Sequence, residues 1–312
     1  MKAVQIKKYG EPDVIEIVDI EKPKVGLGQV LVKVYASSIN PFDVSVIKGF
    51  VANMTDQKLP MVIGLDIAGV VSEVGEGVEN FAVGNKVYGS GGVLSGASGA
   101  FAEFVVTPSN LIAKMPKNLD FNQSAAIVLT GCSAIQALVE HIKLGKDQKI
   151  LIHGGAGGIG TMAIQIAKSL GAYVVTTVSE DGVEYIKKLG VDRIIDYKKE
   201  NFVDLVSDYD AVFDTIGGET FEKSFKVLRR GGILVSMVTK DEKNLAEKYG
   251  VIVFSQFTKV NTEKLDILTD FIENKGVRAC IDKVFSFDRI KDAFDYKEKE
   301  DVLGKIVIQI KN

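Results

Sequence analysis

The clearest chemical signal in the sequence is a glycine-rich turn between a short apolar segment and a run with helical spacing. The segment reads KILIHGGAGGIGTMAIQIAKSLG, and Gly155, Gly157 and Gly160 in it fit the pattern G-x-G-x-x-G. In such a turn the first glycine allows a tight bend, the second lets a pyrophosphate approach the backbone, and the third lets helix and strand pack closely. The start of the helix adds free N–H groups and a partial positive charge. We expect a dinucleotide site here, although the same pattern also occurs as a tight turn without a ligand.

The residue after the second predicted strand bears on which dinucleotide binds. In NAD sites an acidic residue at the end of this strand typically binds the ribose 2′-hydroxyl. Here the strand 172–178 is followed by Ser179, whose hydroxyl can donate a hydrogen bond to a 2′-phosphate. Glu180 and Asp181 come next and would repel a phosphate if their side chains pointed inward. The pattern favours NADPH over NADH.

Three residues after the third predicted strand, Tyr197, Lys198 and Lys199, could add to the same site. Tyr197 offers a hydroxyl, and the two lysines offer positive charge. Neighbouring lysines are more often a solvated surface pair, and we expect that for Lys198 and Lys199. For Tyr197 the residues alone leave a site role and a surface role open.

An isolated acid, Asp66, lies in the glycine-rich apolar segment PMVIGLDIAGVVSEVGEGV, where it could be a catalyst, half of a metal site or a constraint of the fold. The histidines of the chain are His141 and His153, and Cys132 and Cys280 are far apart in sequence. This inventory nearly excludes a metal site built from Cys and His, so we expect no metal.

Two patterns along the chain define the elements that position these residues. Residues 1 to about 120 read as short alternating segments between Gly and Pro, such as KAVQI, VIEIVDI and QVLVKVYAS. They predict a twisted antiparallel sheet, arranged as a partly open barrel. Farther along, apolar strands alternate with helices, at 149–153, 172–178, 193–196, 209–216, 231–238 and 251–257. Repeated β-α-β units predict a doubly wound parallel sheet with helices on both faces.

The ends of these patterns predict the domain organisation. We place the first part of the barrel domain at 1–122 and the α/β domain at 123–262. The segment 263–312 returns to the barrel domain, because KVFSF and GKIVIQI resume the first pattern. The α/β domain is thus inserted into a discontinuous barrel domain.

Composition limits the partners. The chain has 312 residues, of which 46% are hydrophobic and 25% charged, with a net charge of −3. It has no basic stripe of the kind that binds nucleic acid, no signal-peptide core and no apolar run long enough to span a membrane. We expect a soluble, cytoplasmic protein whose partner is a small molecule rather than a nucleic acid or a membrane.

Several motifs, taken in order, resemble the zinc-free medium-chain dehydrogenases/reductases, in their quinone oxidoreductase-like branch. SSINPFDVSVIKG resembles the Asn-Pro-x-Asp segment of that family, and GLDIAGVVSEVGEGVENFAVGNKVYG resembles its glycine-rich segment. HGGAGGIGTMAIQIAKSLGA is similar to its cofactor turn, and FDTIGG and GKIVI extend the match. The resemblance implies a GroES-like barrel domain plus a Rossmann domain, with the active site in the cleft between them. It also implies NADPH-dependent reduction of quinones or activated C=C bonds.

The resemblance further implies roles for individual residues. The pyrophosphate would lie at the glycine turn, the 2′-phosphate at Ser179 and Tyr197, and the nicotinamide near Val238. Many relatives carry a hydroxyl where this chain has Ala156, which puts one phosphate contact in doubt. The implied cofactor-binding residues are Ala156, Gly157, Gly158, Ile159, Gly160, Ser179, Tyr197 and Val238.

Asn40 and Thr130 are the candidate catalytic residues, because the resemblance places them beside the reacting ring. Each could give a neutral hydrogen bond that polarises a carbonyl oxygen. Asn40 could instead shape the turn before Pro41, and Thr130 could cap local backbone. Asp43 fits a structural acid at a helix entry better than a general base. Related enoyl-thioester reductases use a tyrosine proton donor in this region, where this chain has Phe50.

In the zinc-binding relatives a His-Glu pair stands where this chain has Leu65-Asp66, and leucine cannot bind zinc. We therefore expect Asp66 to be a buried or cleft-edge acid that orients neighbouring backbone or an arginine. The leading function is an NADPH-dependent quinone or enone reductase. The alternative is a dinucleotide-binding module with a redox-sensing or structural role and no significant turnover. Relatives in the family are commonly dimers, so we expect a homodimer, in which the segment 251–257 could pair across the interface.

Overall fold

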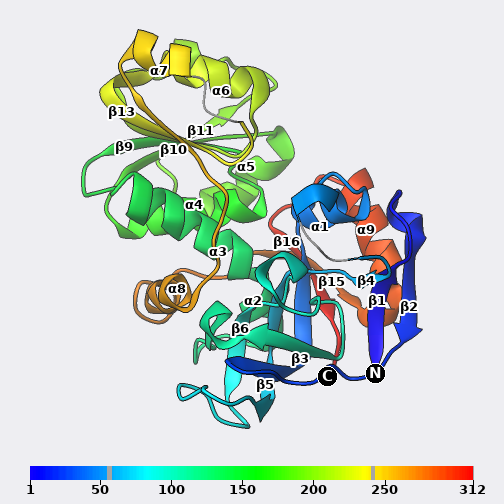
Figure 1. The fold of residues 1–312 in the computed structure, drawn as a ribbon. Coiled ribbons are helices and arrows are strands. Elements are labelled where there is room, and N and C mark those ends of the chain that lie inside the picture. The colour runs from blue at the N-terminus through cyan, green and yellow to red at the C-terminus, as the bar shows by residue number, and fades with distance from the viewer. Residues whose placement is uncertain (55–57, 240–242, 312) are drawn as a thin grey trace. The chain divides into compact units, whose positions relative to one another are not determined.

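The structure is a computed structural model that describes residues 1–54, 58–239 and 243–311, and its chain divides into two compact units (Figure 1). Unit 1 consists of Met1–Leu129, Val260–Thr269 and Ala279–Asn312. Unit 2 consists of Thr130–Lys259 and Asp270–Arg278. Unit 1 is thus built from segments that are far apart in the sequence.

The larger sheet of unit 1 is centred on β3 (Gln29–Ile39), which pairs antiparallel with three strands. Its partners are β5 (Asp66–Val74), β7 (Phe104–Pro108) and β16 (Lys305–Gln309). The strand order is β15-β16-β3-β5-β6-β8, in which the remaining strands are β6 (Lys86–Ser90), β8 (Ile112–Lys114) and β15 (Ile281–Ser286). A smaller sheet has the order β2-β1-β4, formed by β1 (Lys2–Ile6), β2 (Ile15–Asp19) and β4 (Met61–Val62). The predicted antiparallel GroES-like sheet is confirmed, although the β15–β16 pair is parallel.

The glycine-rich segment around Asp66 forms β5, which packs closely against its antiparallel partner β3 at Gly69. A Cβ on Gly69 would lie 2.2 Å from the carbonyl oxygen of Lys33 on the neighbouring strand. A side chain therefore cannot fit between the two strands at this position. Glycine at this position therefore allows the two strands to pack closely.

The helices of unit 1 are short. They are α1 (Pro41–Ile47), α2 (Phe121–Ala126) and α9 (Ile290–Lys299), and α8 (Thr262–Asn274) has residues in both units. Helix α2 begins at a capping box, because the Asp120 carboxylate accepts a hydrogen bond from the Gln123 N–H at 2.8 Å while the Gln123 side chain accepts one from the Asp120 N–H at 3.0 Å.

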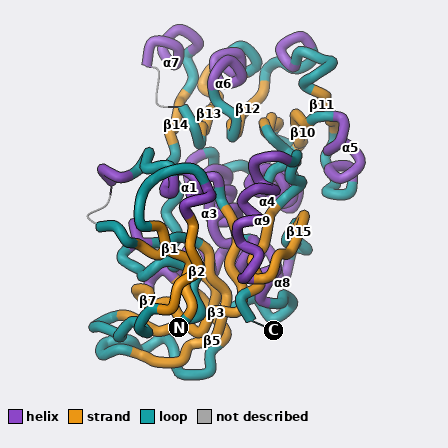
Figure 2. The backbone as a smooth tube through the Cα atoms, turned by 90° about the vertical axis from the view of Figure 1, so that its right-hand side faces the viewer, coloured by secondary structure: helices purple, strands orange, loops and turns teal. Residues whose placement is uncertain are grey.

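Unit 2 contains a parallel sheet with the strand order β11-β10-β9-β12-β13-β14. Figure 2 shows β11 and β14 at its opposite ends. The order changes direction between β9 and β12, which is the topological switch point of a doubly wound sheet. The predicted Rossmann fold is confirmed. The strands are β9 (Lys149–His153), β10 (Tyr173–Val178), β11 (Arg193–Asp196), β12 (Tyr209–Asp214), β13 (Leu228–Ser236) and β14 (Ile252–Ser255).

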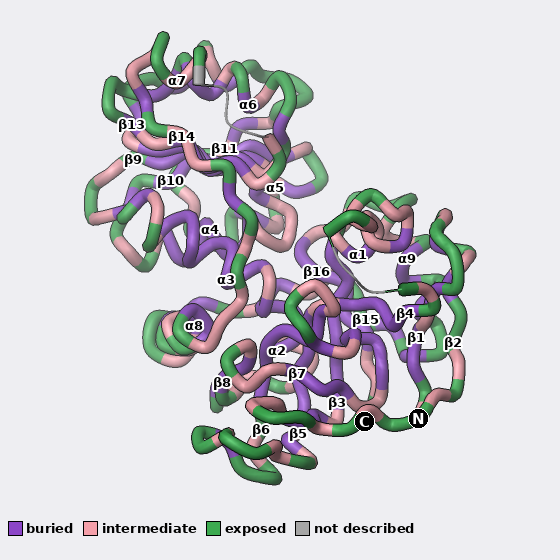
Figure 3. Tube along the Cα trace, viewed as in Figure 1, coloured by how far each residue is buried: buried purple, intermediate pink, exposed green. Residues whose placement is uncertain are grey.

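Helices cover both faces of this sheet, with α4 on one face and α6 and α7 on the other (Figure 1). Their bounds are α4 (Gly158–Ser169), α5 (Glu180–Lys187), α6 (Gly218–Ser224) and α7 (Lys243–Tyr249). The central strands are buried between the two helical layers, as Figure 3 shows. In the part of the chain that the structure describes, no helix is both long and apolar enough to cross a membrane.

The helical segment between residues 121 and 141 is interrupted. Helix α2 ends at Ala126, α3 occupies Val128–Ile135, and a π-helix follows at Gln136–His141. At the first break, the Leu129 N–H donates to the Asp66 carboxylate at 3.1 Å, and the Ala125 carbonyl accepts from the Ser38 hydroxyl at 3.1 Å. A continuous helix would join that N–H to that carbonyl. Side chains from two strands therefore intervene at one helical hydrogen bond, which is a known cause of helix breaks.

Candidate functional site

The glycine turn lies between β9 and α4, and its three glycines serve two different purposes. A Cβ on Gly155 would lie 2.1 Å from the Thr176 hydroxyl oxygen, and one on Gly160 would lie 2.2 Å from the Gly154 carbonyl oxygen. These two glycines are needed by the packing of the protein itself. A Cβ on Gly157 would meet only the Gly154 carbonyl oxygen, at 3.5 Å.

The space above Gly157 is the observation that points to a ligand. Gly157 is the N-cap of α4, and no side chain caps this end of the helix. Gly157, Gly158 and Ile159 are partly exposed, as is Ala156, whereas Gly160 is buried. The N–H groups of the first turn of α4 and the missing Cβ of Gly157 form a cradle that fits an anionic group of pyrophosphate size. We call residues 154–160 the glycine cradle.

A cavity of about 530 Å³ opens next to the cradle, at the carboxyl ends of the central strands. Its position at the β9/β12 switch point is where open α/β sheets bind ligands. A cavity of this size suits part of a dinucleotide. Residues of four strand ends line it, among them Gly154, Thr177, Tyr197, Lys198, Lys199 and Ile216.

The predicted 2′-phosphate residues lie at the ends of β10 and β11. Ser179 is the N-cap residue of α5, is partly exposed, and makes no side-chain capping bond. Tyr197 is 59% exposed and lines the cavity. Glu180, whose charge would repel a phosphate, forms an ion pair with Lys199 at 2.7 Å. This hydrogen bond raises the pKa of the Lys199 ammonium.

The expectation for Lys198 and Lys199 was therefore incomplete. Both side chains are exposed, as expected of surface lysines, but both also line the cavity beside Tyr197. The Lys199 ammonium lies 3.5 Å from the Asp196 carboxylate in addition to its bond with Glu180. These pairings could not be predicted from the sequence, because Glu180 and Lys199 follow different strands and meet only when β10 and β11 pair.

Val238 lies at the opposite end of the same sheet edge, after β13. It is 61% exposed, and its backbone N–H donates to the Ser236 hydroxyl at 3.3 Å. The Ser236 hydroxyl in turn donates to the Asp214 carboxylate at 2.9 Å, and that carboxylate also accepts the Gly217 N–H at 3.0 Å. This network fixes the loops that follow β12 and β13.

Sequence reasoning missed Gln256, which follows β14 beside Val238. Its side-chain N–H groups donate to the Ser133 carbonyl at 3.0 Å and to the Met237 sulfur at 3.2 Å. Its amide oxygen is buried and has no hydrogen-bond partner among the described residues. An unpaired buried acceptor at this edge fits a ligand that carries an N–H donor. The only sequence signal was a polar residue inside the apolar run VIVFSQF.

His153 ends β9 inside the sheet and has a structural role. Its ring nitrogens lie 3.0 Å from the Thr177 hydroxyl and 3.1 Å from the Ser224 hydroxyl. Burial lowers the pKa of His153 to about 4, so the imidazole is neutral at physiological pH. A neutral, fully hydrogen-bonded ring does not serve as an acid in this site.

Asn40 lies in unit 1, at the end of β3, and is 1% exposed. It is the N-cap residue of α1, where it forms a capping box with Asp43. The amide nitrogen donates to Asp66 Oδ2 at 2.7 Å, and the amide oxygen accepts a hydrogen bond from the Lys305 ammonium. The Lys305 ammonium also donates to the Ile39 carbonyl at 2.7 Å and lies 3.5 Å from Asp66 Oδ2.

Asp66 is fully buried and orients backbone, as the sequence indicated. Its cationic partner is Lys305, however, and not an arginine. Of the two expected roles, orienting backbone or an arginine, the structure shows the first. Lys305 was not predicted, because β16, which supplies the lysine, pairs with β3 only in the folded sheet. Leu65, beside it, is partly buried, and no cluster of His, Cys, Asp or Glu suited to a metal occurs among the residues that the structure describes.

Asp43 is a helix-entry acid, as expected. Its carboxylate accepts the Asn40 backbone N–H at 2.7 Å in the first turn of α1, and the residue is 2% exposed. Burial raises the pKa of Asp43 to about 7, and the nearby Asp66 charge acts in the same direction. Thr130, the other predicted catalytic residue, lies in α3 directly after Leu129 and is 3% exposed.

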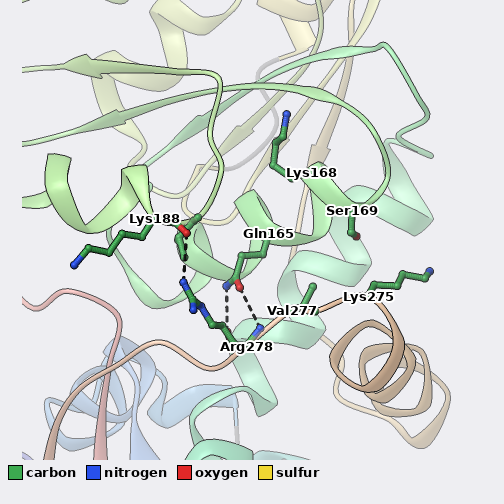
Figure 4. Close-up of a pocket in the computed structure, with 9 residues that line it drawn as sticks. Gln165, Lys168, Ser169, Lys188, Lys275, Val277 and Arg278 are labelled. Carbon is green, nitrogen blue, oxygen red and sulfur yellow. Dashed lines mark hydrogen bonds between the residues drawn. The ribbon is translucent and has the colours of Figure 1, made fainter.

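A second cavity of unit 2, about 370 Å³ in volume, lies between α4 and the segment after α8 (Figure 4). Gln165 holds the Arg278 backbone through two hydrogen bonds of 3.1 Å, and the Arg278 guanidinium donates to the Lys188 carbonyl at 3.3 Å. Lys168, Lys188 and Lys275 extend in different directions in Figure 4 rather than toward one point. The cavity is basic, but its charges do not converge on a ligand.

Two family models match the chain. The model described as "Alcohol dehydrogenase GroES-like domain" matches residues 26–117, and the model described as "Zinc-binding dehydrogenase" matches residues 189–308. These ranges fall largely on the barrel strands of unit 1 and on the later strands of the parallel sheet.

Similar proteins match nearly the whole chain. A 2-methylene-furan-3-one reductase from Solanum lycopersicum is 38% identical over 99% of this chain and 79% of its own length. An NADPH-dependent alkenal/one oxidoreductase from Arabidopsis thaliana is 36% identical over the same shares. The solved structure of the quinone oxidoreductase from Coxiella burnetii superimposes with a TM-score of 0.91 and 32% identity, over 100% of this chain and 99% of that one. The chain belongs to the medium-chain dehydrogenase/reductase family, in the branch of the quinone and alkenal oxidoreductases.

Proposed function

We propose that the protein is an NADPH-dependent, metal-independent reductase of activated C=C bonds, as in enones and enals, and of quinones. The observation that carries this proposal is the glycine cradle, where Gly157 leaves room for a pyrophosphate at the uncapped start of α4. The names of the two plant relatives support the choice of NADPH and of a conjugated carbonyl substrate.

The residues of unit 2 bind and orient the cofactor. Gly158, Ile159 and Gly160 hold the pyrophosphate through backbone N–H groups at the start of α4. Gly157, whose own N–H donates to the Gly154 carbonyl at 3.1 Å, leaves room for it, and Ala156 adds no hydroxyl contact. The other contacts lie at the strand ends. The 2′-phosphate is bound by Ser179 and by Tyr197 and the lysines that line the cavity. The nicotinamide end is bound by Val238 and the Gln256 amide oxygen.

When bound, NADPH supplies a hydride, that is, two electrons and one proton. A conjugated enone accepts the hydride at its β-carbon, the C=C electron pair moves toward the carbonyl oxygen, and the α-carbon then takes a proton from water. Asn40 and Thr130 stabilise the negative charge on that oxygen with neutral hydrogen bonds. A quinone needs less help, because its reduced anion takes a proton directly from water.

A steady-state assay tests the proposal. Purified protein is given NADPH or NADH together with a panel of short enones, enals and simple quinones, and the zinc content of the same sample is measured. We expect NADPH oxidation that depends on an enone or a quinone, without stoichiometric zinc. Tight NADPH binding with no oxidation across the panel would favour the redox-sensing or structural module instead. Stoichiometric zinc would contradict the metal-independent mechanism.

We also propose that the protein forms a homodimer through β14, which is an end strand of the parallel sheet. Ile252 in this strand is 50% exposed, and Phe257 just beyond it is 59% exposed. An exposed apolar edge strand favours pairing with a second chain. The cytoplasmic location stays a prediction from the sequence.

A further inference from the structure

Three neighbouring strands of unit 1 bring charged and polar residues to one edge of the sheet. In the β16-β3-β5 order, Ile306 pairs with Ile39, and Ser38 pairs with Asp66. Lys305 at the start of β16, Asn40 after the end of β3 and Asp66 at the start of β5 therefore meet at the same edge. All three side chains are almost completely buried.

The contacts at this edge hold the Asn40 amide in one orientation. The Lys305 ammonium donates to its oxygen, and Asp66 Oδ2 accepts from its nitrogen at 2.7 Å. A rotated amide would place its N–H groups against the ammonium and its oxygen against the carboxylate, so both contacts would become repulsive. The second N–H of the amide has only a long contact of 3.5 Å, with the Ser38 carbonyl oxygen. The ammonium and the carboxylate polarise the amide, which strengthens this N–H as a donor to a better placed acceptor.

The other oxygen of Asp66 binds the backbone beside the second predicted catalytic residue, Thr130. Asp66 Oδ1 accepts the Leu129 N–H at 3.1 Å, and Ser38, which donates to Asp66 Oδ2 at 2.6 Å, lies 3.1 Å from the Ala125 carbonyl. The carboxylate thus accepts a hydrogen bond from a backbone N–H in the first turn of α3, where intrahelical acceptors are lacking. Thr130 is the next residue of that helix, so its backbone position depends on this bond.

A buried ion pair is often no better for stability than apolar residues of similar volume. Burial lowers the pKa of the Lys305 ammonium, which shows that the site disfavours the charge. The fold alone therefore does not explain why a charged pair stands at this edge, and a role in the site does.

We propose that Asp66 and Lys305 are positioning residues that act through Asn40 and through the start of α3, and that they make Asn40 an oriented hydrogen-bond donor for the substrate carbonyl. This inference rests on the proposed reductase function. The pair does not touch the substrate. It sets the geometry of the two residues that do.

The test combines three sets of substitutions in the NADPH-bound enzyme. Asn40→Ala removes the donor. Asp66→Leu with Lys305→Met removes both charges together, so that no unpaired buried charge is left behind. The third variant carries all three substitutions. Asp295→Leu with Lys299→Met removes an exposed ion pair from α9 in the same unit and serves as the matched control.

We expect Asn40→Ala to lower kcat for an enone on the order of 100-fold. The double variant should lower kcat by a similar factor, and the triple variant should lose no more than the double, because residues that act as one unit are not additive. The Kd for NADPH should stay close to wild type in the double variant and in the control. The thermal midpoint should stay close to wild type in the control and fall in the double variant, because the Leu129 N–H and the Ser38 hydroxyl lose this acceptor. An unchanged kcat in the double variant, or losses that multiply in the triple variant, would overturn the proposal.

Two further measurements separate positioning from folding and from the proposed function. Lys305→Arg keeps a cation and should retain most of the wild-type kcat; a loss as large as that of the double variant would count against an ionic role. In protein labelled with ¹⁵N at asparagine, the Asn40 side-chain signal is identified by its absence in Asn40→Ala. The side-chain N–H protons of Asn40 should exchange with solvent at least about tenfold more slowly in wild type than in the double variant. This signal decides the positioning claim even if wild-type protein reduces nothing, and equal exchange rates would refute it.

Discussion

Ser179 is the residue on which the choice of cofactor depends most directly. It follows β10, where NAD-binding relatives of the fold carry an acid, and its hydroxyl is not used to cap α5. The neighbouring Glu180 is paired with Lys199, so one source of repulsion toward a 2′-phosphate is removed. The side chains at this strand end therefore favour a phosphorylated ribose.

Replacing Ser179 with Asp should reverse this preference. The new carboxylate would repel the 2′-phosphate and accept a hydrogen bond from a 2′-hydroxyl, so kcat/KM for NADPH should fall at least about tenfold while that for NADH rises. Steady-state kinetics with both nucleotides measure the change, and Ser179→Asn serves as the uncharged control. An unchanged ratio of the two kcat/KM values would place the 2′-phosphate elsewhere.

Asp43 gives a pH dependence to the stability of unit 1. Burial raises the pKa of its carboxyl from 3.8 to about 7 in the folded protein. The folded state therefore holds a proton that the unfolded chain releases, and the free energy of unfolding falls as pH rises from about 4 to about 7. The contribution is complete below this window and is lost above it.

Asp43→Asn should remove this dependence, because an amide keeps the acceptor for the Asn40 N–H but does not titrate. We expect the free energy of unfolding of wild type, relative to the variant, to be larger at about pH 5 than at about pH 8, with a slope of at most about 1.4 kcal/mol per pH unit. Urea denaturation at the two pH values measures the difference. An identical difference at both values would show that Asp43 titrates normally.

Helix α4 and its preceding turn form the proposed pyrophosphate site. The turn separates two kinds of glycine, because Gly160 is crowded by the Gly154 carbonyl whereas Gly157 faces open space. The first kind serves the fold, and the second serves the ligand.

The paired substitutions Gly157→Ala and Gly160→Ala distinguish these roles. Gly157→Ala should leave the thermal midpoint unchanged and raise the Kd for NADPH by about tenfold or more, since the new methyl group occupies the cradle. Gly160→Ala should lower the free energy of unfolding by roughly 1–3 kcal/mol through overpacking. Calorimetry and NADPH fluorescence titration measure the two effects. Equal Kd values for wild type and Gly157→Ala would contradict a phosphate cradle.

The elements also show what the sequence could and could not predict. The cradle was predictable because its strand, turn and helix are contiguous, and β9 and β11 lie where the sequence placed them. The break between α2 and α3 could not be predicted, because it depends on Ser38 and Asp66 from distant strands. Lys305 was missed for the same reason, since 265 residues separate it from Asn40. Local patterns predict contacts that neighbouring residues make, whereas the buried network depends on the pairing of β16 with β3.

At the scale of the whole molecule, the proposed homodimer depends on the exposed end of the parallel sheet. Strand β14 pairs with β13 on one side, and its Ile252 is 50% exposed. A lysine on an edge strand opposes pairing with another strand. Ile252→Lys should therefore convert a dimer into a monomer of 33.8 kDa.

Light scattering coupled to size-exclusion chromatography measures this change. The matched control is Val284→Lys, which places a lysine on β15, the end strand of the larger sheet of unit 1, at a residue that is 42% exposed. This control should remain dimeric. A wild-type protein that elutes as a monomer would refute the dimer.

The central claim is that the protein moves a hydride from NADPH to an activated C=C bond. Isotope transfer tests it most directly: the enzyme is given an enone with NADPH that carries deuterium on one face of C4 or on the other, and the product is examined by mass spectrometry and NMR. The account predicts one deuterium at the β-carbon from one of the two labelled cofactors and none from the other, because a bound nicotinamide presents a single face. A reduced product without deuterium from either cofactor, or with equal label from both, would contradict it.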